Sequence, residues 1–463
     1  MFRVFPSRAS SAATYEALLD GILGFVALLA AAVTLGAFPG GLLGVMTDGA
    51  AMATALGFAV VMALLQSFIG VYRHRLALVP LALRVVVVVL LAGYGTYLGL
   101  KELDLHPHPG PLVGAAVAYF LLSLVLLRGA AMALRGVTGV PRVLIVGTGL
   151  EAQAVLDDLR ADDRHMREVI GFYETAFDTE ALVDGAPVFD RARSLPEIAS
   201  RYGIDEIVVA VREQRGGVMP MEQLLTCRTR GIRILDLAAF YERSHAEVPV
   251  DSLKASWLVY GDGFVQGPLR RFAKRVFDIV SSVLLLIVAA PVMLLAALAI
   301  KLDSRGPVFY RQARVGLGGE TFQCVKFRSM RTDAEVDGVA RWATKDDSRI
   351  TRVGALMRKT RIDELPQLIS VLKGEMSIVG PRPERPEFVE KLKDQIPFYD
   401  LRHGVKPGVT GWAQVRFTYG GSIEDARRKH QFDLYYLKNN SIWLDLQVLV
   451  ETVTVVLFRE GAR

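Results

Sequence analysis

Residues 358–368 of the chain read RKTRIDELPQL, in which two adjacent carboxylates, Asp363 and Glu364, follow three cations. Pro366 comes shortly afterwards, and proline is favoured in the first turn of a helix because its missing N–H costs nothing there. Gly374 indicates where that helix ends. We therefore expect both carboxylates at or just before a helix N-terminus, where free N–H groups suit carboxylates and bound phosphate.

The two carboxylates can have different roles, because adjacent residues of a helix do not lie on the same face. One can attack a substrate while the other holds a metal. For this motif alone, a capped surface helix with solvated charges is the alternative interpretation, and the rest of the chain has to decide between the two.

Length and composition indicate a membrane protein with more than one domain. The chain has 463 residues, of which 52% are hydrophobic, and the apolar excess lies before residue 130 and again near 276–302. A net charge of +6 beside apolar helices fits anionic lipids and phosphate substrates better than nucleic acid. The two cysteines, Cys227 and Cys324, lack metal-ligand spacing and fit a reducing compartment.

The first 140 residues predict a four-helix transmembrane bundle. Lys and Arg precede the first apolar run, separate the second from the third and follow the fourth, whereas the other two loops carry only Lys101. The positive-inside rule then places both ends of the bundle in the cytoplasm. Each run is long enough to cross a bilayer; the runs are residues 15–37, 50–70, 78–100 and 111–128.

Residues 141–250 predict a Rossmann-like α/β module, followed by a linker at 251–269. The segment 142–152 reads RVLIVGTGLEA, which is the G-x-G-x-x-A form of the dinucleotide fingerprint. Further strand and helix patterns alternate after it, and such alternation gives a parallel sheet. Glu174 ends the second predicted strand later than the fingerprint spacing requires. We therefore expect a degenerate module that binds no redox cofactor.

Residues 276–302 are apolar and long enough to span a membrane, but two features favour a re-entrant helix. Basic residues flank both ends of the run, so the charge rule gives no preferred direction. Pro291 lies in its middle, where it removes a backbone hydrogen bond and bends the helix. We expect the helix to enter and leave by the cytoplasmic face with its bend at Pro291. A kinked spanning helix is the alternative.

The segment 270–463 predicts a small α+β catalytic domain built on the re-entrant helix. Its glycine- and proline-rich loops carry cations, and prolines lower the entropy cost of presenting a guanidinium to phosphate. One such loop, residues 380–386, reads GPRPERP, and another, residues 402–408, reads RHGVKPG. The cations that we select as anion-binding candidates in this domain are Lys326, Arg328, Arg382, Arg402 and Lys406.

At these residues the chain resembles the bacterial sugar transferases. These are membrane enzymes that move a sugar 1-phosphate onto a polyprenyl phosphate and so begin exopolysaccharide, capsule or O-antigen assembly. The resemblance covers about residues 274–463, and the whole chain is similar to the long members, with four transmembrane helices and a Rossmann-like middle. The segments that carry it are KRVFD at 274–278, KFRSM at 326–330, DELPQ at 363–367, PRP at 381–383 and KPGVTG at 406–411.

The resemblance implies roles for individual residues. Asp363 would be the nucleophile, Glu364 would help to bind Mg²⁺, and Arg358 would be a third catalytic residue. Pro291 would be the re-entrant bend. The residues implied or selected as substrate-binding are Lys326, Arg328, Arg361, Pro381, Arg382, Pro383, Arg402 and Lys406.

The resemblance also implies the partners and the location of the protein. The substrates would be a UDP-sugar and undecaprenyl phosphate, and the other partners would be membrane lipids but no nucleic acid. The protein would be a multi-pass protein of the bacterial inner membrane, with its soluble domains in the cytoplasm. Residues 1–250 would be dispensable for the chemistry, so a chain starting near Gly267 would keep transfer activity.

Two other functions compete with this interpretation. A membrane-tethered, Rossmann-type nucleotide-sugar modifying enzyme needs a Tyr-x-x-x-Lys pair, and the match at Tyr97 and Lys101 lies at the end of a transmembrane run. A non-catalytic scaffold of a polysaccharide machine leaves the carboxylates and cations unexplained. The sequence does not decide which sugar or polysaccharide is involved, whether the Rossmann-like module binds a nucleotide, or whether the bundle and module form a homodimer.

Overall fold

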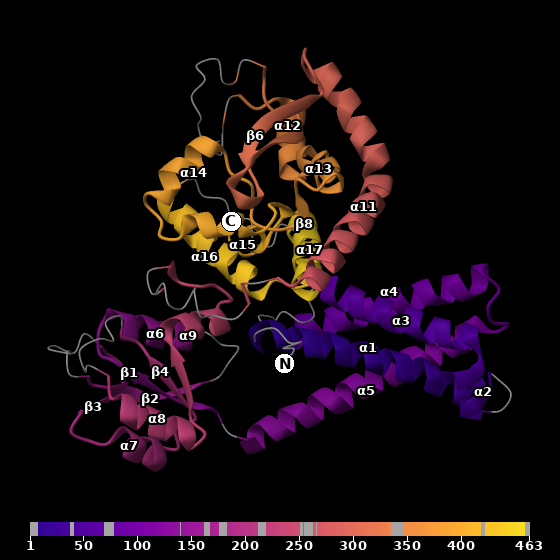
Figure 1. The fold of residues 1–463 in the computed structure, drawn as a ribbon. Helices are drawn as coiled ribbons and strands as arrows, with labels where there is room; N and C mark the ends of the chain where they lie inside the picture. The colour runs from indigo at the N-terminus through magenta and orange to yellow at the C-terminus, as the bar shows by residue number, and fades with distance from the viewer. Residues whose placement is uncertain are drawn as a thin grey trace. The chain divides into compact units, whose positions relative to one another are not determined.

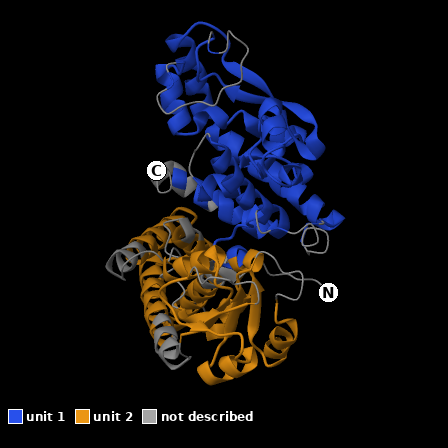
Figure 2. Cartoon of the chain, turned by 90° about the vertical axis from the view of Figure 1, so that its left-hand side faces the viewer, with its two compact units in different colours: residues 1–7, 241–463 blue, residues 8–240 orange. Residues whose placement is uncertain are grey.

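The structure is a computed structural model of the chain and divides into two compact units. The N-terminal unit is Arg8–Phe240 and the C-terminal unit holds Tyr241–Arg463 (Figures 1 and 2). We describe each unit by itself. The structure describes residues 8–37, 41–68, 78–138, 140–161, 167–175, 183–211, 219–250, 253, 263–264, 266–332, 334, 347, 349–417 and 422–458.

The N-terminal unit begins with apolar helices that pack around a core rich in Ala and Val. Within the described residues, α4 and α5 each contain a segment long and apolar enough to cross a membrane. The pair α2 and α3 passes the same test only together, with an 82° bend between them, and α1 contains a shorter apolar helix, Leu18–Thr34. The helices are α1 (Arg8–Thr34), α2 (Gly41–Thr47), α3 (Gly49–Phe68), α4 (Leu78–Glu102) and α5 (Pro109–Thr138).

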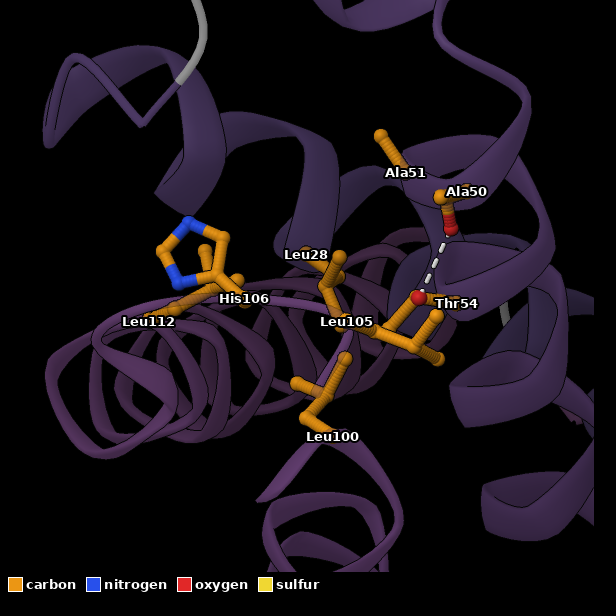
Figure 3. Close-up of a pocket in the computed structure, with 8 residues that line it drawn as sticks. All are labelled: Leu28, Ala50, Ala51, Thr54, Leu100, Leu105, His106 and Leu112. Carbon is orange, nitrogen blue, oxygen red and sulfur yellow. Dashed lines mark hydrogen bonds between the residues drawn. The ribbon is translucent and has the colours of Figure 1, made fainter. Parts of the chain in front are cut away.

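The bend between α2 and α3 was not predicted, because the sequence indicated a plain loop before the second apolar run. Asp48 makes the break, since its Oδ1 accepts a hydrogen bond from Ala51 N at 2.8 Å and so caps the start of α3. A cavity of about 10 Å³ lies close to this turn (Figure 3) and is large enough for one water at most. Leu28, Ala50, Ala51, Thr54, Leu100, Leu105, His106 and Leu112 line it.

The segment predicted as a Rossmann-like module has a parallel five-stranded sheet in the order β3-β2-β1-β4-β5, which confirms the predicted parallel sheet with helices. The central strand β1 reads RVLIV, and its last four residues are fully buried because helices cover both faces of such a sheet. The strands are β1 (Arg142–Val146), β2 (Glu168–Tyr173), β3 (Val188–Phe189), β4 (Glu206–Val209) and β5 (Arg233–Asp236). The helices are α6 (Leu150–Ala161), α7 (Leu195–Tyr202) and α8 (Met221–Thr229), and a further helix, α9 (Leu237–Ser244), crosses the boundary of the unit at Phe240.

The glycine turn after β1 has a structural reason that needs no ligand. Gly147 has φ of 114°, and a Cβ there would lie 3.0 Å from Ala210 O. Only glycine tolerates both this φ angle and the close contact with the backbone of Ala210, which follows β4. Glu174 directly follows β2, whose last residue Tyr173 pairs with Val146. The acidic residue therefore stands beside the end of β1 in space, although its sequence spacing is long. That the module binds no cofactor stays a prediction.

The C-terminal unit includes residues 241–250, which the sequence had grouped with the Rossmann-like module. Ala246, Val248 and Val250 are buried in the main hydrophobic core of this unit. Trp412 Nε1 donates to Ala246 O at 2.9 Å, and Val248 N donates to Gln431 O at 3.1 Å. This segment therefore completes a core made mostly of residues more than 100 positions later in the chain.

A truncated chain that starts at Tyr241 should consequently be more stable than one that starts at Gly267. The shorter chain loses the buried side chains of Val248 and Val250, each of which contributes about 1.5–3 kcal/mol by burial. Thermal unfolding of both chains in the same detergent measures the difference. Equal unfolding midpoints would show that residues 241–250 add nothing to the core.

The apolar helix α11 (Pro268–Asp303) is continuous for 36 residues through Pro291, and most of its surface is exposed. The helix has no break at Pro291, so the predicted re-entrant bend there stays a prediction. Its first half packs on α13, β8 and α17, whereas Ala296 and Ile300 in its second half pack on Phe327 and Met357. Both halves therefore contact the same C-terminal unit, and Figure 1 shows the helix alongside α12 and α13.

The remaining elements of the C-terminal unit are short. A two-stranded antiparallel hairpin, β6 (Phe309–Val315) with β7 (Thr321–Phe327), is followed by a parallel pair, β8 (Ser377–Val379) with β9 (Gly408–Thr410). The helices are α12 (Arg352–Lys359), α13 (Gln367–Lys373), α14 (Pro386–Lys393), α15 (Trp412–Arg416), α16 (Ile423–Asn439) and α17 (Ile442–Phe458), and single helical turns lie at η2 (Leu317–Gly319), η3 (Ile362–Glu364) and η4 (Tyr399–Gly404).

Candidate active site

Asp363 and Glu364 lie in the single turn η3, three residues before α13 begins at Gln367. Gly374 ends α13 in the left-handed conformation with φ of 91°. The predicted position of both carboxylates just before a helix N-terminus is therefore confirmed. Arg361 precedes the turn with φ of 59°, an uncommon conformation for a residue with a side chain, and this bends the chain sharply away from α12.

Three cations converge on the buried carboxylate of Glu364. Its Oε1 accepts hydrogen bonds from Arg382 Nη2 at 2.8 Å and from Lys326 Nζ at 3.1 Å, and its Oε2 accepts one from Arg361 Nη1 at 3.2 Å. Burial alone would raise the pKa of Glu364, but the charges of these three cations outweigh burial and hold the pKa well below its ordinary value. Glu364 is therefore ionised at neutral pH.

Asp363 differs from its neighbour because it is buried without a partner for one oxygen. Among the described residues, no group donates a hydrogen bond to its Oδ1. Burial and the charge of Glu364 raise the pKa of Asp363, against the opposing charges of Lys326, Arg382 and Arg358. A buried acceptor without a partner costs about 1–3 kcal/mol. Such an oxygen, surrounded by cations, is suited to attack an incoming anionic group.

The loop at 380–386 holds Arg382 in a rigid backbone. The carbonyl oxygens of the four successive residues 381–384 each accept a hydrogen bond from a different part of the C-terminal unit. The donors, in order, are Gly408 N at 2.9 Å, Arg402 Nη2 at 3.0 Å, Arg314 Nη1 at 3.0 Å and Val315 N at 2.9 Å. The prolines at 381, 383 and 386 add to this rigidity because they fix φ.

Three of the candidate substrate-binding cations form no hydrogen bond or ion pair with either carboxylate in the described part of the chain. Arg328 donates to Ser304 O and Arg305 O, both at 2.8 Å, and so holds the end of α11. Arg402 is buried and donates hydrogen bonds to Asp433 and Tyr399. Burial and the charge of Arg275 lower the pKa of Lys406. Because Arg275 lies in the N-terminal part of α11, Lys406 is close to that part of the helix. Substrate binding by Arg328, Arg402 and Lys406 stays a prediction.

Arg358 completes the predicted catalytic set. It occupies the last turn of α12 and is half-buried. Its charge opposes the rise in the pKa of Asp363 that burial and Glu364 cause, so it lies within electrostatic reach of that carboxylate. The start of α12 is fixed twice, since Gly354 N donates to Thr351 Oγ1 at 2.9 Å and Val353 N donates to Asp303 Oδ2 at 3.2 Å. Asp303, the last residue of α11, thus helps to place Arg358.

The sequence analysis did not predict that residues at the N-terminal end of α11 hold the elements next to the site. Arg275 donates to Val371 O at 2.6 Å and Leu372 O at 2.7 Å, near the end of the helix that Glu364 precedes. Lys274 contacts Asp445 Oδ2 at 2.9 Å and Asp278 Oδ1 at 3.1 Å and donates to Val379 O at 3.3 Å, just before the Arg382 loop. The i,i+4 spacing of Lys274 and Asp278 was the available signal.

Two histidines near Arg402 are neutral in the folded protein. Burial and the charge of Arg402 lower the pKa of His403 to about 4 and that of His430 to about 3. A base with so low a pKa accepts a proton poorly at neutral pH, which disfavours His403 as a general base.

The stability of the protein should accordingly fall in acid because of His430. Its folded pKa lies below the unfolded value of about 6.5, so the unfolded state binds the extra proton as the pH falls below that value. The free energy of unfolding should fall by about 1.4 kcal/mol per pH unit from this residue between about pH 6 and pH 4. Thermal unfolding measured across this range should show a shallower pH dependence for His430→Gln. Parallel curves would contradict the assignment.

Fold and site together define a protein with several apolar helices and a cation-rich carboxylate site. Residues 269–459 match the bacterial sugar transferase family. The undecaprenyl-phosphate galactose phosphotransferase of Salmonella typhimurium is 42% identical over 344 residues, which cover 69% of this chain and 69% of the relative. This chain therefore belongs to the bacterial sugar transferase family.

Other relatives match mainly through the C-terminal part. A UDP-N-acetylgalactosamine-undecaprenyl-phosphate N-acetylgalactosaminephosphotransferase of Aeromonas hydrophila is 42% identical over 240 residues, or 52% of this chain and 56% of the relative. An undecaprenyl-phosphate glucose phosphotransferase of Komagataeibacter xylinus is 45% identical over 194 residues, or 41% of this chain and 36% of the relative. The chain thus spans about half of the one relative and about a third of the other.

Proposed function

We propose that the protein is a phosphoglycosyltransferase that moves a sugar 1-phosphate from a UDP-sugar to undecaprenyl phosphate. The observation that carries the proposal is the pair of carboxylates in η3: Asp363 has a buried oxygen to which no described residue donates, and Glu364 is paired with three cations. The names of the relatives, which describe transfer to undecaprenyl phosphate from several sugars, support the same reaction class.

The reaction proceeds in two displacements. In the first, Asp363 Oδ1 attacks the phosphorus that bears the sugar, the bond from that phosphorus to the UMP oxygen breaks, and UMP leaves with the electron pair. In the second, an oxygen of undecaprenyl phosphate attacks the same phosphorus and the aspartyl oxygen leaves, which restores Asp363 and gives undecaprenyl-diphosphate-sugar.

The cations beside Glu364 are placed to stabilise this transfer. Negative charge develops on the transferring phosphate and on the leaving UMP, and fixed guanidinium and ammonium groups lower the barrier where such charge appears. Lys326, Arg361 and Arg382 are already ordered by Glu364 before substrate binds. They need no further reorganisation during the reaction.

The donor set also fits Mg²⁺. This ion is bound in proteins by one or two carboxylates together with waters and substrate phosphates, and Asp363 and Glu364 supply adjacent hard oxygen atoms. Glu364 would hold the ion, which when bound would neutralise charge on the phosphates. Among the described residues no group of three or more His, Cys, Asp or Glu could hold a metal, so the substrate phosphates would have to complete its ligands.

Release of UMP tests the proposal directly. Purified full-length protein is incubated with undecaprenyl phosphate and, in turn, UDP-glucose, UDP-galactose or UDP-N-acetylgalactosamine. We expect UMP and a lipid-linked sugar diphosphate with at least one of them. UDP instead of UMP would indicate a different bond cleavage and would refute the proposal, as would the absence of any turnover with every sugar tested.

The membrane arrangement that supports this function is a four-crossing bundle followed by a re-entrant α11. The crossings are α1, the bent pair α2 and α3, α4 and α5, and the positive-inside rule places both ends in the cytoplasm. For α11, the support is that both halves pack on the same C-terminal unit. A spanning helix would put its two ends on opposite sides of the membrane, where one folded unit could not reach both.

Cysteine labelling in cells tests the re-entrant helix. Gly267 and Arg305 flank α11 and are exposed, so Gly267→Cys and Arg305→Cys are made singly in a chain without Cys227 and Cys324. Both should be protected from a membrane-impermeant maleimide in spheroplasts and labelled once the membrane is permeabilised. Labelling of only one position from outside would establish a spanning helix, and labelling of both would place the C-terminal unit outside the cytoplasm; either result would overturn the arrangement.

A further inference from the structure

Arg402 is a buried arginine whose guanidinium is bonded entirely to protein groups. It is 5% exposed and lies in the turn η4, between α14 and β9. Its Nε and Nη2 donate to Asp433 Oδ2 at 3.2 and 2.8 Å, and its Nη1 donates to Tyr399 Oη at 2.7 Å. A guanidinium has five N–H donors in a fixed fork, so these bonds, with the one described next, leave almost no capacity for a substrate.

The remaining bond of Arg402 reaches the active site through the backbone. Its Nη2 donates to Arg382 O at 3.0 Å, and the side chain of Arg382 in turn donates to Glu364 Oε1 at 2.8 Å. A continuous path therefore runs from Asp433 on α16 to the catalytic carboxylates. Each link in it is buried or half-buried, where hydrogen bonds to charged groups are strongest.

We propose that Arg402, anchored by Asp433, is a positioning residue that orients Arg382 toward Glu364, and that it does not contact the substrate. The proposal rests on the proposed function and assigns a separate role within it. The carbonyl oxygens on either side, Pro381 O and Pro383 O, accept hydrogen bonds from Gly408 N and Arg314 Nη1. Arg402 therefore fixes only the peptide group between residues 382 and 383. Rotation of that peptide would turn the Arg382 side chain away from the phosphates.

Lysine is the informative replacement at position 402. Arg402→Lys keeps the positive charge beside Asp433 but cannot donate to Asp433, Tyr399 and Arg382 O together, because a single ammonium lacks the planar fork. Arg402→Ala would leave the Asp433 carboxylate buried without a partner and would risk unfolding. Tyr399→Phe removes only the hydroxyl that accepts from Arg402 and provides a milder test.

The experiment is a double-mutant cycle of Arg402→Lys with Arg382→Ala in the full-length protein, with UMP release measured at varied UDP-sugar concentration. Arg402→Lys should lower kcat on the order of tenfold to a hundredfold with little change in KM, since small misplacements of a catalytic group have effects of this size. Tyr399→Phe should lower kcat only a few-fold. In the Arg382→Ala background Arg402→Lys should have almost no further effect, because the group that it positions is gone.

Arg416→Lys is the matched control. Arg416 is an exposed arginine of the same unit, paired with Glu451 at 2.8 Å and stacked on Trp412, and within the described residues it forms no hydrogen bond to the Arg382 loop. Its replacement should leave kcat unchanged. Thermal unfolding midpoints of every variant show whether an activity loss follows from unfolding.

Several outcomes would overturn the proposal. An increase in KM alone for Arg402→Lys would show that the residue binds substrate. Losses that multiply in the double variant would show that Arg402 acts independently of Arg382 or only through stability. If the wild-type protein releases no UMP, the proposed function fails; if it does and the cycle is multiplicative, only the positioning role fails.

Discussion

Replacing Asp363 with Asn should abolish sugar-phosphate transfer while the protein stays folded. The amide has the same shape but no nucleophilic oxygen, so turnover should fall more than about a thousandfold. Burial and the neighbouring Glu364 raise the pKa of Asp363, which means that the negative charge is unfavourable there. Removing this charge should leave the unfolding midpoint unchanged or raise it.

Two measurements check this result. UMP release reports the loss of turnover, and mass spectrometry of the wild-type protein incubated with UDP-sugar alone should find a phospho-sugar adduct on the peptide that contains Asp363. The matched control is Asp400→Asn, which changes an exposed carboxylate of the same unit and should have no effect. Full activity in Asp363→Asn would refute the assignment of the nucleophile.

Replacing Glu364 with Gln should have the opposite effect on stability and a large effect on rate. Lys326, Arg361 and Arg382 would lose the carboxylate that they share, and a neutral amide cannot balance three nearby cations. A loss of partners for partly buried charged groups costs about 1–3 kcal/mol, so the unfolding midpoint should fall. Transfer should slow on the order of a hundredfold because the three cations, and the Mg²⁺ proposed to bind here, would no longer be held in place.

Activity measured against Mg²⁺ concentration separates the two roles of Glu364. Glu364→Gln should need more Mg²⁺ for half-maximal rate, and EDTA should inactivate the wild-type protein. If the wild type stays active in excess chelator, Glu364 only orders the cations. If Glu364→Gln unfolds at the same temperature as the wild type, the ion pairs seen in the structure do not contribute to its stability.

The direct connection between α11 and the site explains why the base of this helix is rich in charge. Arg275 contacts the end of α13, the helix that follows Glu364, and Lys274 contacts the last residue of β8, which leads into the Arg382 loop. The apolar helix α11 is thereby fixed both to the helix that follows Glu364 and to the strand that precedes Arg382.

Short-range patterns in the sequence were enough to predict individual helices and strands, because these depend mainly on residues close together in the chain. Pro366 and Gly374 predicted a short helix directly after the carboxylates. The prediction could be made locally because proline restricts the backbone angle φ and glycine permits the left-handed conformation that ends a helix. The alternation of strands and helices in 141–250 predicted a parallel sheet, which the structure has. Long apolar runs predicted the apolar helices, although α2 and its bend were missed because one side chain, Asp48, makes the break.

Only the tertiary structure decided which cations serve the carboxylates. Lys326 and Arg328 are two positions apart, which in a strand would place both on one face. The strand β7 ends at Phe327, however, so Lys326 turns to Glu364 and Arg328 turns to the end of α11. The sequence selected Arg402 as an anion-binding candidate, and only the structure shows that its guanidinium donates to Asp433, Tyr399 and Arg382 O.

The extent of the C-terminal unit was likewise decided by packing. Residues 246–250 carry no motif, and their place in the core depends on Trp412 and on residues of α16 far along the chain. By itself the sequence determined the family, the kinds of element and the identity of the carboxylate pair, since these follow from short-range patterns. The partners of those carboxylates and the completion of the core depend on long-range contacts, which no local pattern encodes.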